Sequence, residues 1–352
     1  MTSKNIKTIQ EHSAFHDNRY HANFAVVDIR KQITVLIDTF GKRHMSRDKP
    51  ASNATQRKRI DMLHHFVDQL RDKGYLLKNI LNLDSRHIEA IVSTWKAEKL
   101  GAATIATYYS LLRWLVQCIG KAGMVMSLAH FNFTKEETAR AYIAKSDKSW
   151  GSNNVDFHEV VCKVRQISPF PAIYLELCDA FGLRLQEAIL IRPLIAWQGS
   201  TLNVVDGTKG GRPRSVPVRT DHQRDVLKRA IEMAKGTLTG SMVPVGRNLK
   251  QSLQNAYYIF RKVGITKAQS GISPHGLRHG YANDRYEEEA GVPSTVRGGD
   301  QQAVDREKDH DARMVVSAEL GHSRVNILGA YTGGRKRGRP SSKACLPNPI
   351  QA

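Results

Sequence analysis

The sequence predicts a mainly α-helical protein (α+β) of two domains, with one small β-hairpin in the second. Its 352 residues are enough for two hydrophobic cores of ordinary size. Apolar residues recur at helical spacing over most of the chain, whereas TLNVV (201–205) and SVPV (215–218) have the pattern of two short strands around a glycine-rich turn. The polar stretch 134–152 between these regions predicts an interdomain linker.

The first domain, residues 21–133, follows a short N-terminal segment (1–20) and is predicted to be a small helical bundle. Apolar residues lie at helical spacing in four successive stretches, Val26 to Phe40, Ile60 to Leu70, Ile88 to Trp95 and Ile105 to Ile119. Asp84 is expected to cap the third helix and Gly101 to stop it, while 46–55 has the composition of a loop.

The second domain, residues 153–334, is predicted to be mostly helical around the hairpin. An apolar helix over 171–181 is closed by Gly182, and Thr220 with Gln223 forms a capping box that begins a helix over 220–235. Further helical patterns lie around 249–263, 276–289, 313–320 and 324–331. A basic tail, 335–352, completes the chain.

The charge balance indicates a polyanionic partner. Lys and Arg number 53 against 33 Asp and Glu, a formal net charge of +20, so nucleic acid is the first expectation and a basic surface with no partner the second. Eight arginines and lysines are candidates for contact with the DNA backbone: Arg57, Lys58, Arg59, Arg113, Arg212, Arg214, Arg337 and Arg339.

The sequence also predicts the cellular compartment and the redox state of the cysteines. No apolar run approaches the ~20 residues that span a bilayer, and the first residues are too polar for a signal peptide, so a cytoplasmic, nucleoid-associated protein is expected. The four cysteines, Cys118, Cys162, Cys178 and Cys345, are widely spaced, which predicts reduced thiols that fill the core.

The stretch SPHGLRHGY (273–281) concentrates groups that could do chemistry. Ser273 and Pro274 start a helix, and His275 and Arg278 then lie three apart on one face, where both could reach one anion. His279 stands four residues from His275, which is also the spacing of zinc ligands. A metal site stays open, although Arg278 between the two histidines would oppose a cation.

Three other segments of the same domain form an ordered set of motifs with this one. They are FGLRLQE (181–187), the hairpin lysine in GTKGG (207–211), and LGHSRVNILGAY (320–331), in which Tyr331 follows His322 by nine residues. The ordered set resembles the tyrosine recombinase, or phage integrase, family, and within it an integrase of a prophage or other mobile element. The resemblance covers about 155–332 closely, and 20–130 loosely as a helical core-binding module.

The resemblance implies a role for each matching residue. Tyr331 is the nucleophile, Arg184, Arg278 and His322 bind the scissile phosphate, His275 handles the proton of the nucleophile, and Lys209 protonates the leaving 5′ oxygen. These roles suit a phosphoryl transition state, which needs fixed cations and hydrogen-bond donors, and arginine can place two N–H bonds on one phosphate. Glu187 and His279 are expected to support the others from behind. Tyr281 and Tyr286, rival nucleophiles by proximity, are interpreted as packing or DNA-contacting residues.

The same resemblance implies strand cutting and rejoining through a 3′-phosphotyrosyl bond, with no metal and no cofactor such as ATP. The expected partners are double-stranded attachment sites, three further copies of the chain in a homotetramer on DNA, and accessory bending or directionality factors. A type IB topoisomerase and a catalytically silent DNA-binding regulator with the same fold remain alternatives, as does a metal-dependent hydrolase that uses His275 and His279.

Two features depart from the family pattern. Between Arg278 and His322 lie 43 residues, about twenty more than such enzymes usually have, and the excess (287–313) is interpreted as a surface insertion. In the tail, Arg337-Gly338-Arg339-Pro340 reproduces the core of an AT-hook, which binds the narrow minor groove, although a plain basic tail or one that docks on a neighbouring protomer fits equally well.

Overall fold

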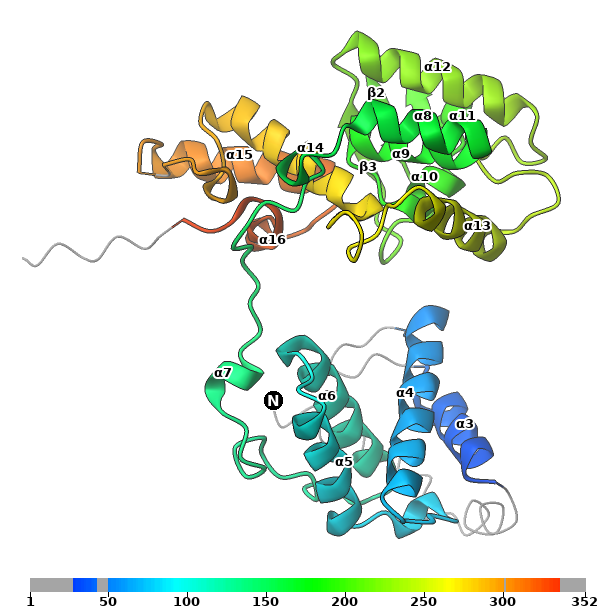
Figure 1. The fold of residues 1–352 in the computed structure, drawn as a ribbon, viewed down its shortest axis with the longest axis vertical. Coiled ribbons are helices and arrows are strands. Elements are labelled where there is room, and N and C mark those ends of the chain that lie inside the picture. Colours follow the sequence, from blue (N-terminus) through cyan, green and yellow to red (C-terminus); the bar gives the residue numbers. More distant parts are fainter. Residues whose placement is uncertain (1–27, 43–49, 301, 336–352) are drawn as a thin grey trace, which may run out of the picture. The chain divides into compact units, whose positions relative to one another are not determined.

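The computed structural model describes residues 28–42, 50–300 and 302–335 and divides into two compact units, one ending at Arg140 and the other beginning at Ala141 (Figure 1). The division lies inside the predicted linker 134–152. The end of that stretch packs into the second unit, because Trp150 is only 3% exposed and its indole N–H donates to the carbonyl of Ser273 (2.8 Å). Val26 and the basic tail from residue 336 lie outside the described residues.

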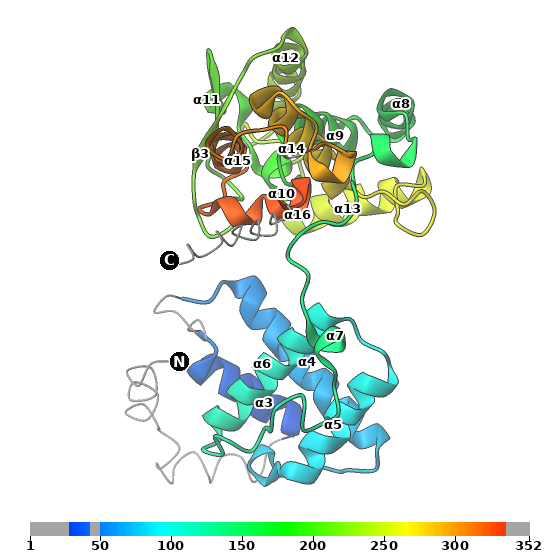
Figure 2. The same cartoon turned by 90° about the vertical axis from the view of Figure 1, so that its left-hand side faces the viewer.

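The first unit is a bundle of amphipathic helices around one core (Figure 2), as the apolar periodicity predicts. Trp95 and Leu112 are completely buried at its centre. Its helices are α3 (Ile29–Phe40), α4 (Asn53–Asp72), α5 (Ser85–Ala97), α6 (Ala102–Cys118) and the short α7 (Lys135–Thr138).

Two helix boundaries in this unit differ from the prediction. Helix α4 begins at Asn53, inside the predicted loop 46–55, because the Ser52 hydroxyl accepts the N–H of Thr55 (3.2 Å) and caps it. Asp84 caps α5 as predicted. Gly101 does not stop that helix, which ends at Ala97, but is the N-cap residue of α6.

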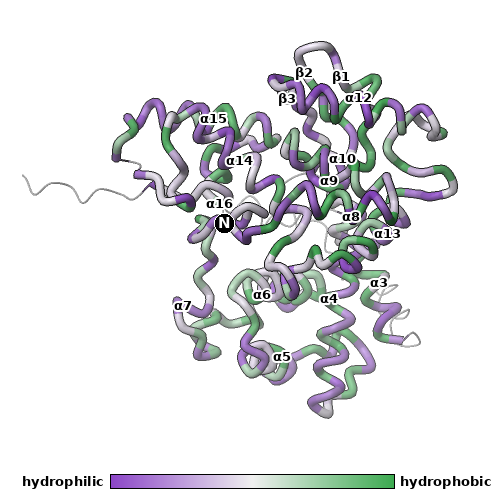
Figure 3. The backbone as a smooth tube through the Cα atoms, turned by 45° about the horizontal axis from the view of Figure 1, so that its top comes forward, coloured by the Kyte–Doolittle hydropathy of each residue, from purple (hydrophilic) through white to green (hydrophobic). Residues whose placement is uncertain are grey.

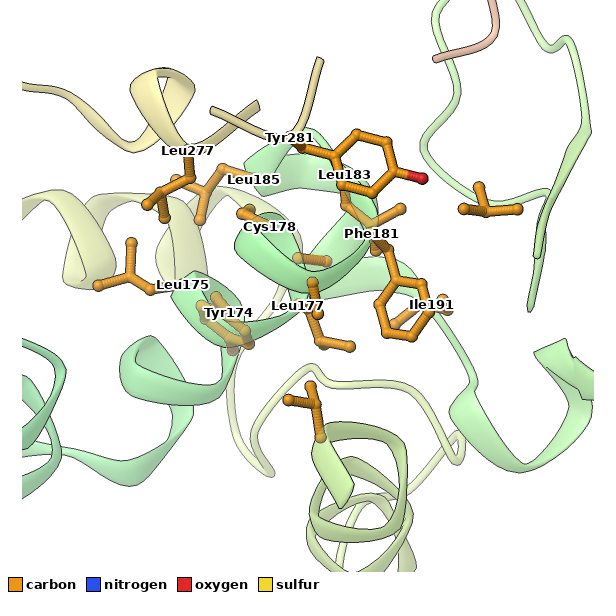
Figure 4. Close-up of a cluster of buried hydrophobic side chains, with 14 of the residues drawn as sticks. Tyr174, Leu175, Leu177, Cys178, Phe181, Leu183, Leu185, Ile191, Leu277 and Tyr281 are labelled. Carbon is orange, nitrogen blue, oxygen red and sulfur yellow. The ribbon is translucent and has the colours of Figure 1, made fainter. Parts of the chain in front are cut away.

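The second unit is built around α9 (Pro169–Phe181), which is mostly apolar and largely buried. Leu183 and Leu277 belong to the cluster that covers α9 (Figure 4). Helix α14 (Pro274–Ala290) packs against α9, α15 (Arg306–Glu319) and α16 (Gly329–Thr332). The remaining helices are α8 (Phe157–Ile167), α10 (Leu185–Leu190), α11 (Pro193–Ala196), α12 (Asp221–Lys235) and α13 (Leu249–Lys262).

Helix α12 illustrates how sequence pattern places an outer helix. The capping box of Thr220 and Gln223 starts it as predicted, and α12 carries both hydrophilic and hydrophobic residues (Figure 3). Val226, Leu227 and Ala230 are completely buried against the rest of the unit. Among the described residues, no helix combines the length and apolar character that crossing a membrane requires.

The predicted hairpin is present as part of a three-stranded antiparallel sheet in the order β1-β2-β3. Strands β2 (Thr201–Val204) and β3 (Arg214–Pro217) pair with Leu202 opposite Val216, and both side chains are completely buried. Strand β1 (Trp197–Gln198) was not predicted, because two residues are too few to show an alternating pattern.

The stretch 287–313, interpreted as a surface insertion, is mostly exposed or half-buried, but it also contributes to two helices and buries some of its side chains. Its first residues end α14 at Ala290, and its last belong to α15, which begins at Arg306 rather than at the predicted 313. Ser294, Val304 and Arg313 are all less than 9% exposed, so the stretch packs onto the body of the unit. The predicted helix 324–331 is instead a 3₁₀ turn (Val325–Ile327) followed by α16.

The cysteines follow the prediction in part. Cys118 and Cys178 are buried thiols, as expected of residues that fill the core. Cys162 is exposed on α8, so its predicted place in the core is wrong. Cys345 lies outside the described residues.

Gly182, which ends α9 in a left-handed conformation (φ 60°), should not tolerate a side chain. A Cβ there would lie 2.6 Å from Cδ1 of Tyr281, so we expect Gly182→Ala to lower the free energy of unfolding by about 3 kcal/mol, measured by urea denaturation. The control is Gly264→Ala, which has φ 83° but open space around the new methyl, and should cost only about 1 kcal/mol. Equal losses in both variants would contradict the steric argument.

Candidate active site

The turn between α9 and α10 holds Arg184 and Glu187 together. Arg184 is the N-cap residue of α10, where its N–H donates to Oε2 of Glu187 (2.8 Å) and its Nη1 to Oε1 (2.6 Å). The Arg184 side chain is 22% exposed, while that of Glu187 is completely buried. The carboxylate therefore orients the arginine from behind and leaves part of the guanidinium open to solvent.

Glu187 also binds an arginine of the sheet. Arg214 in β3 donates to both carboxylate oxygens of Glu187 (3.0 and 2.7 Å) and, through Nε, to the carbonyl of Glu319 (2.7 Å). Burial alone would raise the pKa of Glu187, but the hydrogen bonds and charge of Arg214 and the nearby Arg184 hold it below its usual value. Glu187 is thus a buried carboxylate that stays ionised among arginines.

Helix α14 brings Arg278 into the same cluster. Its side chain is completely buried, with Nη1 donating to the carbonyl of Gly182, Nη2 to that of Leu320, and Nε to the hydroxyl of Tyr331 (3.3 Å). Its Nη1 also lies 4.0 Å from Oε2 of Glu187. One guanidinium therefore joins the ends of α9 and α15 to the tyrosine.

Tyr331 sits among three histidines. The tyrosine is 6% exposed, and its ring centroid lies 4.6 Å from that of His279, 5.8 Å from His322 and 5.9 Å from His275. His322 follows Gly321, whose left-handed φ of 68° ends α15 and turns the chain back, while the N–H of His322 donates to the carbonyl of Ser317 (2.8 Å). Nε2 of His322 lies 3.5 Å from Nη2 of Arg278.

The electrostatics of the cluster keep the imidazoles neutral. Burial, followed by the charges of Arg278 and Arg184, lowers the pKa of His275 to about 4 and that of His322 to about 3. Burial and the neighbouring His275 lower the pKa of His279 to about 4 as well. The positive charge at neutral pH therefore resides on the arginines.

Lys209 lies on the turn between β2 and β3 with its side chain exposed. Its charge is one of several that lower the pKa of His322, after burial and the charges of Arg278, Arg184 and Arg214. The structure thus gathers Arg184, His275, Arg278, His322 and Tyr331, with Glu187 bonded to Arg184 and His279 packed on Tyr331, whereas Lys209 lies on the exposed turn.

Two predicted DNA contacts are wrong because the side chains are buried. Arg214 is occupied by Glu187, as described above, and Arg59 is 5% exposed, donates to the carbonyl of Gly41 and lies 5.4 Å from the centre of the Trp114 ring. A run of basic residues does not reveal which of them turns inward on the helix.

The other predicted DNA contacts lie at the surface. Lys58 and Arg212 are exposed, and Arg57 is exposed with an ion pair to Asp61 (3.3 Å). Arg113 is exposed as well, with its guanidinium 5.7 Å from the centre of the Tyr109 ring. Arg337 and Arg339 lie outside the described residues.

Sequence reasoning missed the role of Glu319. This buried carboxylate accepts the hydroxyl of Tyr281 (2.6 Å), Nε of Arg285 (3.3 Å) and an N–H of Arg219. The only available signal was its position directly before the Leu320-Gly321-His322 motif. Tyr286 is similarly occupied, since its hydroxyl donates to Asp309 (2.6 Å), so both rival tyrosines are packing residues.

The metal-site alternative rests on His275 and His279, whose ring centroids lie 5.3 Å apart. Within residues 28–42, 50–300 and 302–335, no group of three or more His, Cys, Asp or Glu side chains has an arrangement that could hold a metal ion. Nδ1 of His279 is buried without a hydrogen-bond partner in the described structure and lies in a ring that packs on Tyr331.

Two family models match the chain. The model described as "Integrase" matches residues 140–284, which include Arg184, Lys209, His275 and Arg278, and the model described as "Phage integrase, N-terminal" matches residues 42–125. His322 and Tyr331 lie beyond both matched ranges. No curated protein matches the sequence significantly.

Solved structures with the same fold include DNA complexes of integrases. A lambda integrase dimer bound to a COC′ core site has a TM-score of 0.57 and 13% identity over 90% of this chain and 81% of its own. A lambda integrase tetramer bound to a Holliday junction has a TM-score of 0.54 and 13% identity over 89% of this chain and 80% of its own. The Tn1549 transposon integrase in complex with a circular intermediate DNA has a TM-score of 0.52 and 10% identity over 86% of this chain and 94% of its own.

Removal of the buried carboxylate should destabilise the second unit. We expect Glu187→Ala to lower the free energy of unfolding by about 3–5 kcal/mol in urea denaturation, because Arg214 and Arg278 would be left as unpaired buried charges. As a control, Glu159→Ala removes one partner of the exposed pair with Lys163 and should cost less than about 1 kcal/mol. A similar cost in both variants would contradict the role assigned to Glu187.

The pH dependence of stability tests the histidine cluster. His279 titrates at about 4 in the folded chain and near 6.5 when unfolded, so the unfolded state binds more protons as the pH falls between these values. The stabilisation is complete above pH 6.5 and is lost on acidification toward pH 4. Urea denaturation should show wild type losing up to about 3 kcal/mol more than His279→Gln over this range. The exposed His158→Gln serves as the control and should follow wild type, and a His279→Gln curve parallel to wild type would contradict the assignment.

Proposed function

Because the chain belongs to the tyrosine recombinase family, we propose that it is a site-specific DNA recombinase, an integrase, that cuts and rejoins strands through a 3′-phosphotyrosyl intermediate on Tyr331 without metal or ATP. One observation carries this proposal. The Tyr331 hydroxyl lies 3.3 Å from Nε of Arg278, in a cluster that also contains Arg184, His275 and His322.

Phosphate binding falls to the two arginines and His322. A phosphodiester undergoing attack accumulates negative charge on its nonbridging oxygens, and fixed guanidinium groups stabilise that charge without reorganising. The Arg184 guanidinium is backed by Glu187, and Arg278 is fixed by two backbone carbonyls. His322 is neutral at pH 7, so it can donate one N–H to the phosphate without adding a further charge.

The nucleophile is activated by its surroundings. Tyr331 Oη forms a bond to phosphorus while its proton passes to His275, whose neutral ring carries one nitrogen without a proton; the negative charge of a bound phosphate would offset the arginine charges that lower its pKa. The bond between phosphorus and the 5′ oxygen breaks, and the ammonium group of Lys209 supplies the proton of the leaving 5′ hydroxyl. Arg278 stabilises the phenolate character that develops on Tyr331 as the proton departs.

Rejoining reverses these steps. The 5′ hydroxyl of a partner strand attacks the phosphotyrosyl bond, Lys209 takes its proton and His275 returns one to Tyr331. Because the phosphotyrosyl bond keeps the energy of the broken phosphodiester, the exchange needs no nucleotide hydrolysis. Strand exchange between two sites then calls for four protomers on DNA, with bending or directionality factors as further partners.

DNA binding is expected to involve both units. The formal charge of +20 favours release of counterions from a nucleic-acid backbone, and the exposed Lys58, Arg113 and Arg212 are the candidates for phosphate contact. The match to phage integrase domains and the likeness of the fold to a transposon integrase support an origin in a mobile element.

The proposal is tested by trapping the covalent intermediate. Incubation with nicked candidate attachment-site DNA should give an SDS-stable adduct that mass spectrometry maps to Tyr331. Tyr331→Phe should abolish the adduct while leaving DNA affinity within about twofold of wild type, and Arg278→Lys should slow adduct formation by roughly 10²- to 10³-fold.

The matched control is Tyr258→Phe, at a half-exposed tyrosine of α13, which should form the adduct at the wild-type rate. Adducts should form equally in EDTA. A wild-type adduct on any other residue, or full activity of Tyr331→Phe, would refute the proposal. Relaxed plasmid as the sole product would instead identify a type IB topoisomerase.

A further inference from the structure

The residues directly after the nucleophile are held by the stretch that sequence analysis treated as an insertion. Oγ1 of Thr295 donates to the carbonyl of Thr332 (2.9 Å), and Nη1 of Arg313 donates to Oγ1 of Thr332 (3.2 Å) and to the carbonyl of Gly333 (3.2 Å). Thr332 is completely buried between them. Both backbone carbonyls that follow Tyr331 are therefore bound by side chains from outside α16.

Gly333 fits closely into this arrangement. Its φ of 77° lies in the left-handed region, and a Cβ on it would come within 2.2 Å of Oγ1 of Thr295. The chain can pass so near the threonine hydroxyl only because residue 333 has no side chain.

The segment around Thr295 and the side chain of Arg313 are themselves held by further hydrogen bonds. The hydroxyl of Ser294 donates to Oδ1 of Asn283, whose Nδ2 lies 3.4 Å from the carbonyl of Tyr331. Three residues after Ser294, Arg297 donates through Nε to Asp147 (3.0 Å). Arg313 donates to Asp309 within α15 (2.9 Å).

The nucleophile needs such support because its own helix is short. Helix α16 has four residues, too few to be stable alone, so its position depends on tertiary contacts. Without them the hydroxyl of Tyr331 would not be kept at 3.3 Å from Nε of Arg278.

We propose that Asn283, Ser294, Thr295 and Arg313 form a clasp that holds Tyr331 in the active site of its own protomer, with Thr295 and Arg313 as positioning residues for the cleavage step. This inference rests on the proposed function, in which Tyr331 is the nucleophile. The contacts from Thr295 and Arg313 reach residues 332 and 333 and leave the phosphate-binding groups Arg184 and His322 untouched. The clasp therefore governs the alignment of the attacking oxygen and not the affinity for DNA.

The test removes one hydroxyl. Thr295→Val keeps the shape of the side chain but not its hydrogen bond to Thr332, whereas Thr295→Ser keeps the hydroxyl. At saturating DNA we expect Thr295→Val to form the Tyr331 adduct roughly five- to tenfold more slowly than wild type, with DNA affinity unchanged, and Thr295→Ser to restore the wild-type rate.

Thr237→Val is the matched control, because Thr237 also donates its hydroxyl to backbone carbonyls (Ala234 and Ser241, both 2.8 Å) but outside the clasp. It should cleave at the wild-type rate. A wild-type rate in Thr295→Val, or a parallel loss of DNA affinity and rate, would overturn the proposal.

Hydrogen exchange gives a second measurement that needs no activity. Without DNA, peptides covering residues 325–335 should take up deuterium faster in Thr295→Val than in wild type, Thr295→Ser or Thr237→Val. Unchanged exchange in that segment would overturn the clasp. If wild type forms no adduct on Tyr331 yet exchange rises as expected, the proposed function fails while the clasp remains as a structural element.

Discussion

The whole cluster around Tyr331 depends on one buried negative charge. Glu187 is completely enclosed, and its carboxylate receives hydrogen bonds from Arg184 and Arg214 and faces Arg278 at 4.0 Å. Without it, three guanidinium groups from α10, β3 and α14 would repel one another in a region with little water. With it, two of them are oriented by direct hydrogen bonds, and the net excess of positive charge is left to attract an anion.

Arg278 links this charged cluster to three parts of the backbone and side chains around it. Its three nitrogens contact the carbonyls of Gly182 and Leu320 and the hydroxyl of Tyr331, so segments that are remote in sequence meet at one side chain. The left-handed glycines at 182 and 321 allow both chain ends to turn there. The contacts of Arg278 that order the cluster are therefore also contacts that hold the fold together.

Much of this could be predicted from sequence, because the chemistry is carried by short motifs at helix ends. Asp84 and Thr220 with Gln223 mark helix starts, and four short motifs supplied the candidate residues that the structure brings close together. The facing of charged residues could not be predicted: Arg59 and Arg214 lie in basic stretches yet are buried, since periodicity in charge does not distinguish an exposed arginine from one with a buried acceptor. The packing of residues 287–313 was missed for a similar reason, because a charged segment can still bury its few apolar and paired side chains.

The close approach at Gly276 has a mechanical consequence. The carbonyl of Lys148 and the indole of Trp150 occupy the space that a Cβ at 276 would need, and the indole N–H is bonded to Ser273 at the start of α14. The segment that contains Lys148 and Trp150 therefore packs directly against the first turn of α14. A side chain at position 276 would have to push these two segments apart and so displace the helical turn that carries His275 and Arg278.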